Sequence, residues 1–205
     1  MTMRPIRVLV AEDQQLVLGA IAALLALEDD IDIVGQARDG DAALVTVRRL
    51  VPDILVTDIE MPGRSGIDVA DAIADEALPT RTIMLTTFGR MGYFARARRA
   101  GVRGYLLKDA PIDELLAAIR TVASGGRAIS PALIAASEQA PPDPLNPRER
   151  DVLRLAESGL SNRDIGDTLG LAAGTVRNYL SDAGSKLGAG NRIEACRIAR
   201  GSGWL

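Results

Sequence analysis

The chain of 205 residues contains no histidine and a single cysteine, Cys196. Because histidine is the commonest metal ligand and the usual general base, its absence excludes zinc sites, Ser-His-Asp triads and Cys-His pairs. One cysteine cannot form an internal disulfide. Aromatic residues make up 3% of the chain, while 47% is hydrophobic and 25% is charged, which is typical of a soluble globular protein.

Long apolar runs are missing as well. No run reaches the roughly 18 residues that a membrane helix needs, and residues 1–5 lack the apolar stretch of a signal peptide. We therefore expect a cytoplasmic protein without membrane insertion.

The net charge of −3 is unevenly distributed. Residues 1–144 carry 15 basic and 20 acidic residues, whereas residues 145–205 carry 9 basic and 7 acidic ones. This pattern predicts an acidic domain joined to a mildly basic one. The basic excess of the second part is too small to indicate nucleic-acid binding by itself, so the positions of the charges must decide.

Short apolar runs alternate with helical periods in the first 124 residues. A parallel sheet covered by helices on both faces is the architecture that such alternation favours. We predict a doubly wound, five-stranded α/β domain over residues 1–124. The strand candidates are Ile6–Val10, Ile31–Val34, Ile54–Thr57, Thr82–Leu85 and Tyr105–Leu107.

Glycine and proline then mark a change of character. Residues 125–144 contain Gly125-Gly126 and several prolines, which predicts a linker. Residues 145–205 contain no strand candidate, and Asn146-Pro147-Arg148-Glu149 is typical of a helix start. We predict a smaller all-α domain of four helices there, over about 147–158, 162–169, 173–187 and 192–200.

Polar residues follow four of the predicted strands: Glu12 and Asp13 the first, Asp58 the third, Thr86 the fourth and Lys108 the fifth. A parallel sheet gathers such positions at one edge, where carboxylate oxygens without histidine or thiolate suit Mg²⁺. Asp58 is then a candidate nucleophile that forms an aspartyl phosphate, with Mg²⁺ and Lys108 neutralising the phosphoryl group and Thr86 hydrogen-bonding to it.

Two other interpretations of this set remain open. Acidic residues and threonines are common at strand ends, so each residue on its own could be ordinary loop chemistry. An aspartyl phosphatase would also use a nucleophilic aspartate, but it would want a second acid two residues later, where this chain has Glu60. We therefore do not expect an enzyme of that kind.

The helical domain contains a helix-turn-helix pattern from Ser161 to Lys186. The second helix has one apolar face and one polar face that could contact phosphates and base edges in a major groove. A solvated helical bundle or a dimerisation module would give the same charge pattern. The predicted DNA contacts are Thr175, Arg177, Asn178, Ser181 and Lys186, with Arg192 at the start of the last helix.

Several motifs make residues 4–124 resemble the receiver domain of bacterial response regulators, a domain with the flavodoxin-like or CheY-like fold. The motifs are Ala11-Glu12-Asp13, Val56-Thr57-Asp58-Ile59-Glu60-Met61-Pro62-Gly63, Leu85-Thr86-Thr87 and Gly104-Tyr105-Leu106-Leu107-Lys108-Asp109.

This resemblance implies that Asp58 accepts phosphate from a sensor histidine kinase. It implies Mg²⁺ coordination by Asp13, Asp58 and the backbone carbonyl of Glu60, with Glu12 acting through water. It also implies that Thr86 and Tyr105 form a switch pair, which biases a pre-existing two-state element.

Residues 145–201 resemble the LuxR/NarL type of DNA-binding domain, so the whole chain is similar to NarL-family transcription regulators, and most of all to the DesR-like subfamily. The resemblance implies a regulator that dimerises on phosphorylation and binds promoter DNA, with membrane-lipid desaturation genes as one candidate target. A phosphorylation-independent regulator that uses its receiver for dimerisation is the alternative. The motifs are Leu145–Leu153, Gly159–Asn162, Gly174–Tyr179, Lys186–Gly188 and the terminal Gly203-Trp204.

Some positions depart from the family pattern. Ala172 and Ala173 stand where a capping serine and a glutamate are usual, Gly184 lies inside the recognition helix, and Gly190 replaces a larger residue. We expect a weakened recognition helix for which dimerisation compensates. Leu16, Ala20, Ala23 and Leu27 form a second apolar line on the first helix, which is either a dimer interface or part of a broad core stripe.

Overall fold

The computed structural model describes residues 4–87, 92–134 and 142–205. The chain divides into two compact units, one built on a β-sheet and one entirely helical, and each is described by itself. In the described ranges no helix combines the length and the apolar character needed to cross a bilayer.

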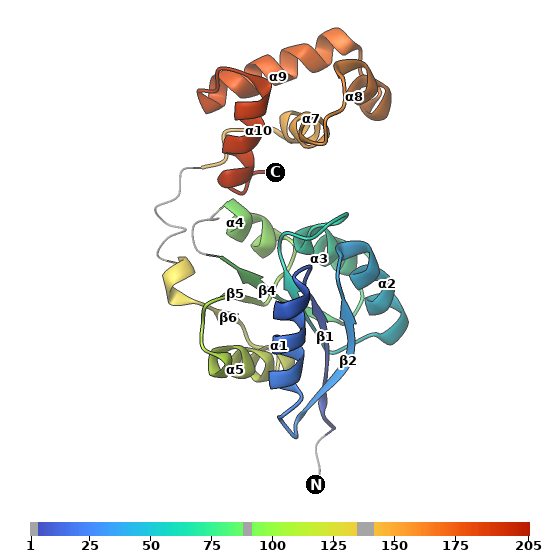
Figure 1. Ribbon diagram of the computed structural model, residues 1–205, viewed down its shortest axis with the longest axis vertical. Helices are drawn as coiled ribbons and strands as arrows, with labels where there is room; N and C mark the ends of the chain where they lie inside the picture. The colour runs from blue at the N-terminus through green and yellow to red at the C-terminus, as the bar shows by residue number, and fades with distance from the viewer. Residues whose placement is uncertain (1–3, 88–91, 135–141) are drawn as a thin grey trace. The chain divides into compact units, whose positions relative to one another are not determined.

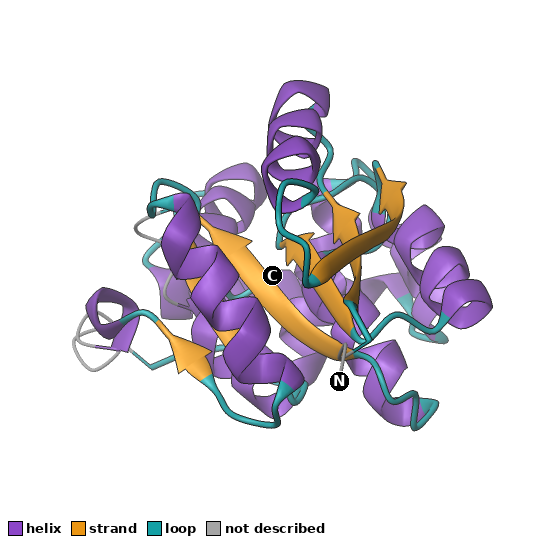
Figure 2. Cartoon of the chain, turned by 90° about the horizontal axis from the view of Figure 1, so that it is seen from below, coloured by secondary structure: helices purple, strands orange, loops and turns teal. Residues whose placement is uncertain are grey.

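The sheet of the first unit is parallel throughout and has the strand order β2-β1-β3-β4-β5-β6 (Figure 1). Figure 2 shows the strands in orange among the purple helices. Five of its strands fall at the predicted positions, and the prediction of a doubly wound parallel α/β fold is confirmed. The strands are β1 Ile6–Ala11, β2 Ile31–Ala37, β3 Ile54–Asp58, β4 Arg81–Thr86, β5 Gly104–Leu107 and β6 Ala128–Ile129.

The predicted strand number of five is corrected by the short strand β6. Ala128 pairs with Gly104 and Ile129 with Tyr105, so β6 extends the sheet beyond β5. Two residues that follow a glycine pair carry no periodic pattern, which is why the sequence did not predict this strand. β6 also lies inside the stretch expected to be linker, and the domain limits of 124 and 145 stay a prediction.

Helices cover both faces of the sheet. Successive strand residues point to opposite faces, so Val8 packs with α1 and α5 in one core, while Leu9 packs with α2 and α3 in another. The helices of this unit are α1 Gln15–Leu25, α2 Gly40–Leu50, α3 Gly66–Asp75, α4 Gly92–Arg99 and α5 Ile112–Ala123.

The second unit consists of four helices around one apolar core that includes Leu153, Ile165 and Val176. Its helices α7 and α8 begin with capping boxes, at Asn146 and Glu149 and at Ser161 and Asp164. The four predicted helices are confirmed. They are α7 Pro147–Glu157, α8 Asn162–Leu169, α9 Ala173–Leu187 and α10 Arg192–Gly201.

Candidate functional site

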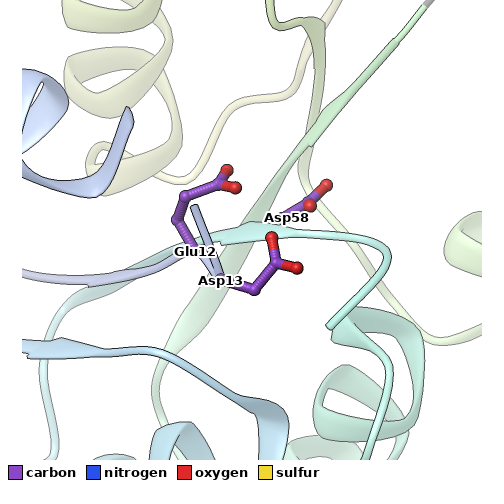
Figure 3. A group of neighbouring side chains, drawn as sticks. All are labelled: Glu12, Asp13 and Asp58. Carbon is purple, nitrogen blue, oxygen red and sulfur yellow. The ribbon is translucent and has the colours of Figure 1, made fainter. Parts of the chain in front are cut away.

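Three carboxylates meet at the carboxyl edge of the sheet (Figure 3). Glu12 and Asp13 directly follow β1, and Asp58 is the last residue of the adjacent strand β3. One carboxylate oxygen from each lies within 4.8 Å of the others. Glu12 and Asp58 are buried and Asp13 is exposed, so the group opens to solvent on the Asp13 side.

Lys108, directly after β5, supplies the positive charge that this group requires. Its Nζ lies 2.8 Å from Asp58 Oδ2 and 2.8 Å from Glu12 Oε2. Burial would lower the pKa of Lys108, but the two carboxylates outweigh burial and raise it, so the ammonium stays charged. Burial raises the pKa of Asp58 and of Glu12, against the opposing effect of Lys108.

The two oxygens of Asp58 are held in different ways. Oδ1 accepts a hydrogen bond of 2.7 Å from the backbone N–H of Ile59, while Oδ2 faces Lys108. These contacts fix the carboxylate at the strand end with an orientation that does not depend on side-chain packing alone. An ionised carboxylate held in this way can act as a nucleophile.

The donor set fits a hard divalent cation. The carboxylates of Glu12, Asp13 and Asp58 offer oxygen ligands without any nitrogen or sulfur, which is the set that Mg²⁺ prefers. Glu60 is half-buried two residues after Asp58, and the part predicted for its backbone carbonyl stays a prediction.

The two predicted switch residues are both buried on neighbouring strands. Thr86 ends β4, and its hydroxyl donates to the backbone carbonyl of Thr87 at 3.2 Å. Tyr105 lies in β5, and its ring meets Phe94 of α4 edge to face, with 5.2 Å between the ring centroids. Thr86 follows Leu85, the register partner of Asp58, and Tyr105 pairs with Met84, which precedes Leu85, so both residues lie within one register position of Asp58. Their switching stays a prediction.

A glycine that sequence reasoning missed lies against the same site. A Cβ on Gly66, the first residue of α3, would lie 2.1 Å from the backbone carbonyl oxygen of Asp58. That carbonyl also accepts a hydrogen bond from the hydroxyl of Thr57 at 2.8 Å. The close approach explains why residue 66 has no side chain. The sequence shows a glycine eight residues after Asp58 but no signal for the contact.

The outer face of α9 carries most of the predicted DNA contacts. Arg177, Asn178 and Ser181 are exposed, and Thr175 is half-buried. Val176 and Ala183 are fully buried in the core of the unit. This arrangement agrees with a helix that packs by one side and presents the other to a partner, and the contacts themselves stay a prediction.

Lys186 and Arg192 have partners inside the helical unit. Lys186 Nζ lies 2.7 and 2.8 Å from the two carboxylate oxygens of Glu149, whose side chain is 3% exposed. Arg192 donates to the backbone carbonyls of Ala156 and Leu160, both at 2.9 Å. These bonds give both residues a structural role that the sequence did not predict, and their role at DNA stays a prediction.

Two of the unusual residues of α9, Ala172 and Gly184, lie at the start and in the middle of the helix. The N-cap residue Ala172 has extended backbone angles and makes no side-chain cap hydrogen bond. A Cβ added to Gly184 would have its nearest neighbour, the carbonyl oxygen of Ala189, at 3.7 Å. The helix therefore lacks a side-chain cap at its N-terminus and contains a glycine at a position where a side chain would fit.

Two family models match the two parts of the chain. The model of the response regulator receiver domain matches residues 8–120, and the model of bacterial regulatory proteins of the luxR family matches residues 143–199. The chain is 47% identical over 200 residues to the uncharacterised transcriptional regulatory protein YvfU of Bacillus subtilis, covering 98% of this chain and 100% of that protein.

Two further relatives cover nearly the full length. Transcriptional regulatory protein DesR of Bacillus subtilis is 44% identical, with 98% of this chain and 99% of DesR covered. The crystal structure of the response regulator ChrA, from a heme-sensing two-component system, is 34% identical and superimposes with a TM-score of 0.59, covering 99% of this chain and 100% of ChrA.

Proposed function

The chain belongs to the two-component response regulators that join a receiver domain to a LuxR-type DNA-binding domain, and from this membership we propose that Asp58 is its phosphoacceptor. The observation that carries the proposal is the position of Lys108, whose ammonium lies 2.8 Å from both Asp58 and Glu12 beside the exposed Asp13. The phosphodonor is a phosphohistidine of a sensor kinase.

The residues of the chain divide the work of phosphoryl transfer. A carboxylate oxygen of Asp58 forms a bond to phosphorus while the bond from phosphorus to the donor nitrogen breaks. Lys108 turns from the carboxylate toward a phosphoryl oxygen and offsets its charge, and the Thr86 hydroxyl donates to another. Asp13, Asp58 and the carbonyl of Glu60 would hold Mg²⁺, with Glu12 acting through water, and the bound ion would neutralise the additional negative charge.

Phosphorylation then controls assembly. Leu16, Ala20, Ala23 and Leu27 are all exposed, with Leu16 at 86% and Leu27 at 77%, so this apolar line is not part of the core. An exposed apolar line along α1 and the turn that follows it is a candidate surface for a homodimer. A dimer presents two recognition helices to paired half-sites of promoter DNA. The proposed place of action is the cytoplasm, where promoter DNA is available.

In the DNA complex, α9 enters the major groove. Arg177 contacts a phosphate or a guanine, Asn178 and Ser181 reach base edges, and Thr175 contacts the backbone near the start of the helix. Genes of membrane-lipid desaturation are a candidate target that rests on the motif resemblance alone. Genome-wide mapping of DNA bound by wild type and by Asp58→Ala tests both the target and its dependence on phosphorylation.

Intact-mass measurement tests the phosphoacceptor directly. After incubation with acetyl phosphate and Mg²⁺, we expect one added phosphoryl group on the wild type and none on Asp58→Ala. Asp75→Ala, which removes an exposed carboxylate at the end of α3, is the matched control and should be labelled like the wild type. Removal of Mg²⁺ with EDTA should abolish labelling. Labelling of Asp58→Ala at the wild-type level would overturn the proposal.

The same samples separate the proposal from a phosphorylation-independent regulator. We expect acetyl phosphate to shift wild type toward a dimer in sedimentation and to tighten its binding to promoter DNA, with no such change in Asp58→Ala. Equal oligomeric state and equal binding of both proteins under both conditions would favour the independent regulator, for which the receiver serves as a dimerisation module.

A further inference from the structure

Helix α9 presents a continuous polar stripe to solvent. Ser181, Asp182 and Ser185 follow Asn178 by three, four and seven residues, so the four residues share one side of the helix, and all four are exposed. The opposite side carries Val176 and Ala183, which are fully buried. The stripe is therefore the surface that α9 offers to a groove. Asp182 is its one acidic residue, and none of its four residues is basic.

The buried Glu149 explains why this acid has no counterion. Lys186 follows Asp182 by four residues, the spacing at which an ion pair normally forms on a helix surface. Both oxygens of Glu149 instead hold the Lys186 ammonium, at 2.7 and 2.8 Å. Within residues 142–205 the structure gives the Asp182 carboxylate no hydrogen-bond or ion-pair partner, so it stays open toward solvent.

A free carboxylate on a recognition helix restricts what it can contact. It accepts hydrogen bonds and donates none, it is repelled by phosphates, and it meets the acceptors of guanine and thymine unfavourably. The exocyclic amino groups of cytosine and adenine remain. Adenine places its N7 acceptor beside the amino group, whereas the cytosine ring has no acceptor at that edge, so a carboxylate favours cytosine.

We propose that Asp182 is a specificity-determining residue that accepts a hydrogen bond from the amino group of a cytosine in the DNA half-site. The proposal deepens the proposed DNA-binding function and rests on it. Asn178, one turn earlier on the same stripe, has the paired donor and acceptor that match adenine.

The helix geometry sets the spacing of the two bases. Four residues along a helix correspond to about 6 Å, at roughly 1.5 Å per residue. Successive base pairs lie about 3.4 Å apart along the duplex. Asn178 and Asp182 therefore read adenine and cytosine within about two base-pair steps of each other, and each half-site contains this pair once.

Selection from a randomised duplex DNA library tests the proposal with the full chain, in the presence and absence of acetyl phosphate and Mg²⁺. We expect wild type to select a half-site in which one position is cytosine, with roughly 10-fold discrimination against other bases there. In Asp182→Asn the preferred base at that position should change from cytosine to adenine, because an amide matches adenine. In Asp182→Ala the preference should disappear while the remaining positions are unchanged.

Asp167→Asn is the matched control, since it removes an exposed carboxylate from α8 of the same unit. It should retain the wild-type motif. The inference is overturned if Asp182→Asn and Asp182→Ala select the wild-type motif, or if Asp182→Asn and Asp167→Asn merely raise the affinity for all sequences equally. If wild type enriches no motif under either condition, the proposed DNA-binding function fails and the inference fails with it.

Discussion

The ion pair between Lys186 and Glu149 offers the sharpest test of how α9 is held. The pair has one buried partner and one partly exposed one, since the Glu149 side chain is 3% exposed and the Lys186 side chain 39%. Exposed pairs contribute about 0–1 kcal/mol, and breaking a fully buried pair costs about 3–5 kcal/mol. Lys186→Met leaves the Glu149 carboxylate buried without its cation, so we expect a cost of about 2 kcal/mol.

The expected loss is easily measured. For a domain of this size, 1 kcal/mol corresponds to roughly 4–8 °C in the melting temperature, so the helical unit of Lys186→Met should melt about 8 °C lower or more. Arg197→Met is the control, because it removes an exposed cation whose contact with Glu194 is 3.9 Å long, and it should melt like wild type. Adding Glu149→Gln to Lys186→Met should recover most of the loss, since no charge then stays buried.

The salt dependence of DNA binding distinguishes a structural lysine from a phosphate contact. Loss of one phosphate contact lowers the slope of log affinity against log salt by about 0.9. We expect this decrease for Arg177→Met, and the slope for Lys186→Met shows whether the lysine also makes its predicted DNA contact. The reasoning would be refuted if Lys186→Met melted like wild type and lowered the slope, because the lysine would then act at DNA and not within the domain.

Three further predictions concern single residues. Gly66→Ala should slow phosphoryl labelling in the mass assay, because its Cβ would lie 2.1 Å from the carbonyl oxygen of Asp58 and displace the acceptor. Ala172→Ser and Gly184→Ala should each raise the free energy of unfolding by about 1 kcal/mol, measured by urea denaturation, through a cap and a better helix former. Burial acts to raise the pKa of Asp53, but hydrogen bonds from Arg7 N–H and Arg4 outweigh it and lower the pKa. The stabilisation that the Asp53 carboxylate gives the folded state is therefore present above its unfolded pKa of about 3.9 and is lost as pH falls below that value. The free energies of unfolding of wild type and Asp53→Asn should differ near pH 7 and converge in acid.

Each of these has a result that contradicts it. Gly19→Ala, which adds a Cβ with no neighbour within 4 Å, should leave labelling unchanged, and equal rates for Gly19→Ala and Gly66→Ala would exclude a steric effect on Asp58. Unchanged or lower stability of Ala172→Ser and Gly184→Ala would refute the expectation that Ala172 and Gly184 weaken α9. A stability difference at Asp53 that stays constant from neutral to acid pH would show that its carboxylate is not the cause.

The edge of the sheet could be predicted from the sequence because strand ends are visible in it. Glu12, Asp58 and Lys108 each follow an apolar run, and parallel topology brings such positions together however far apart they lie in the chain. The structure places all three in contact, as expected. The close approach of Gly66 could not be derived in this way, because it depends on the path of the loop between β3 and α3.

In the helical unit the helices could be predicted from the sequence, but the pairing of the charged side chains could not. Capping boxes and apolar spacing predicted the four helices, since these signals are local. The spacing of Lys186 places it on the polar side of α9 and predicts a DNA contact, which stays a prediction. Its partner Glu149 lies 37 residues earlier and is buried, and no sequence pattern shows that a glutamate will be buried and paired over such a distance.

The short strand β6 pairs the chain that leaves the first unit with β5, the strand of Tyr105. Ile129 is in register with Tyr105, and the N–H of Ser130 donates to the Tyr105 carbonyl at 3.0 Å. A backbone displacement at Tyr105 must therefore either move residues 128–130 with it or break the hydrogen bonds that join β5 and β6. The chain that leaves the sheet at Ser130 is consequently hydrogen-bonded to Tyr105, the residue predicted to respond to phosphorylation of Asp58.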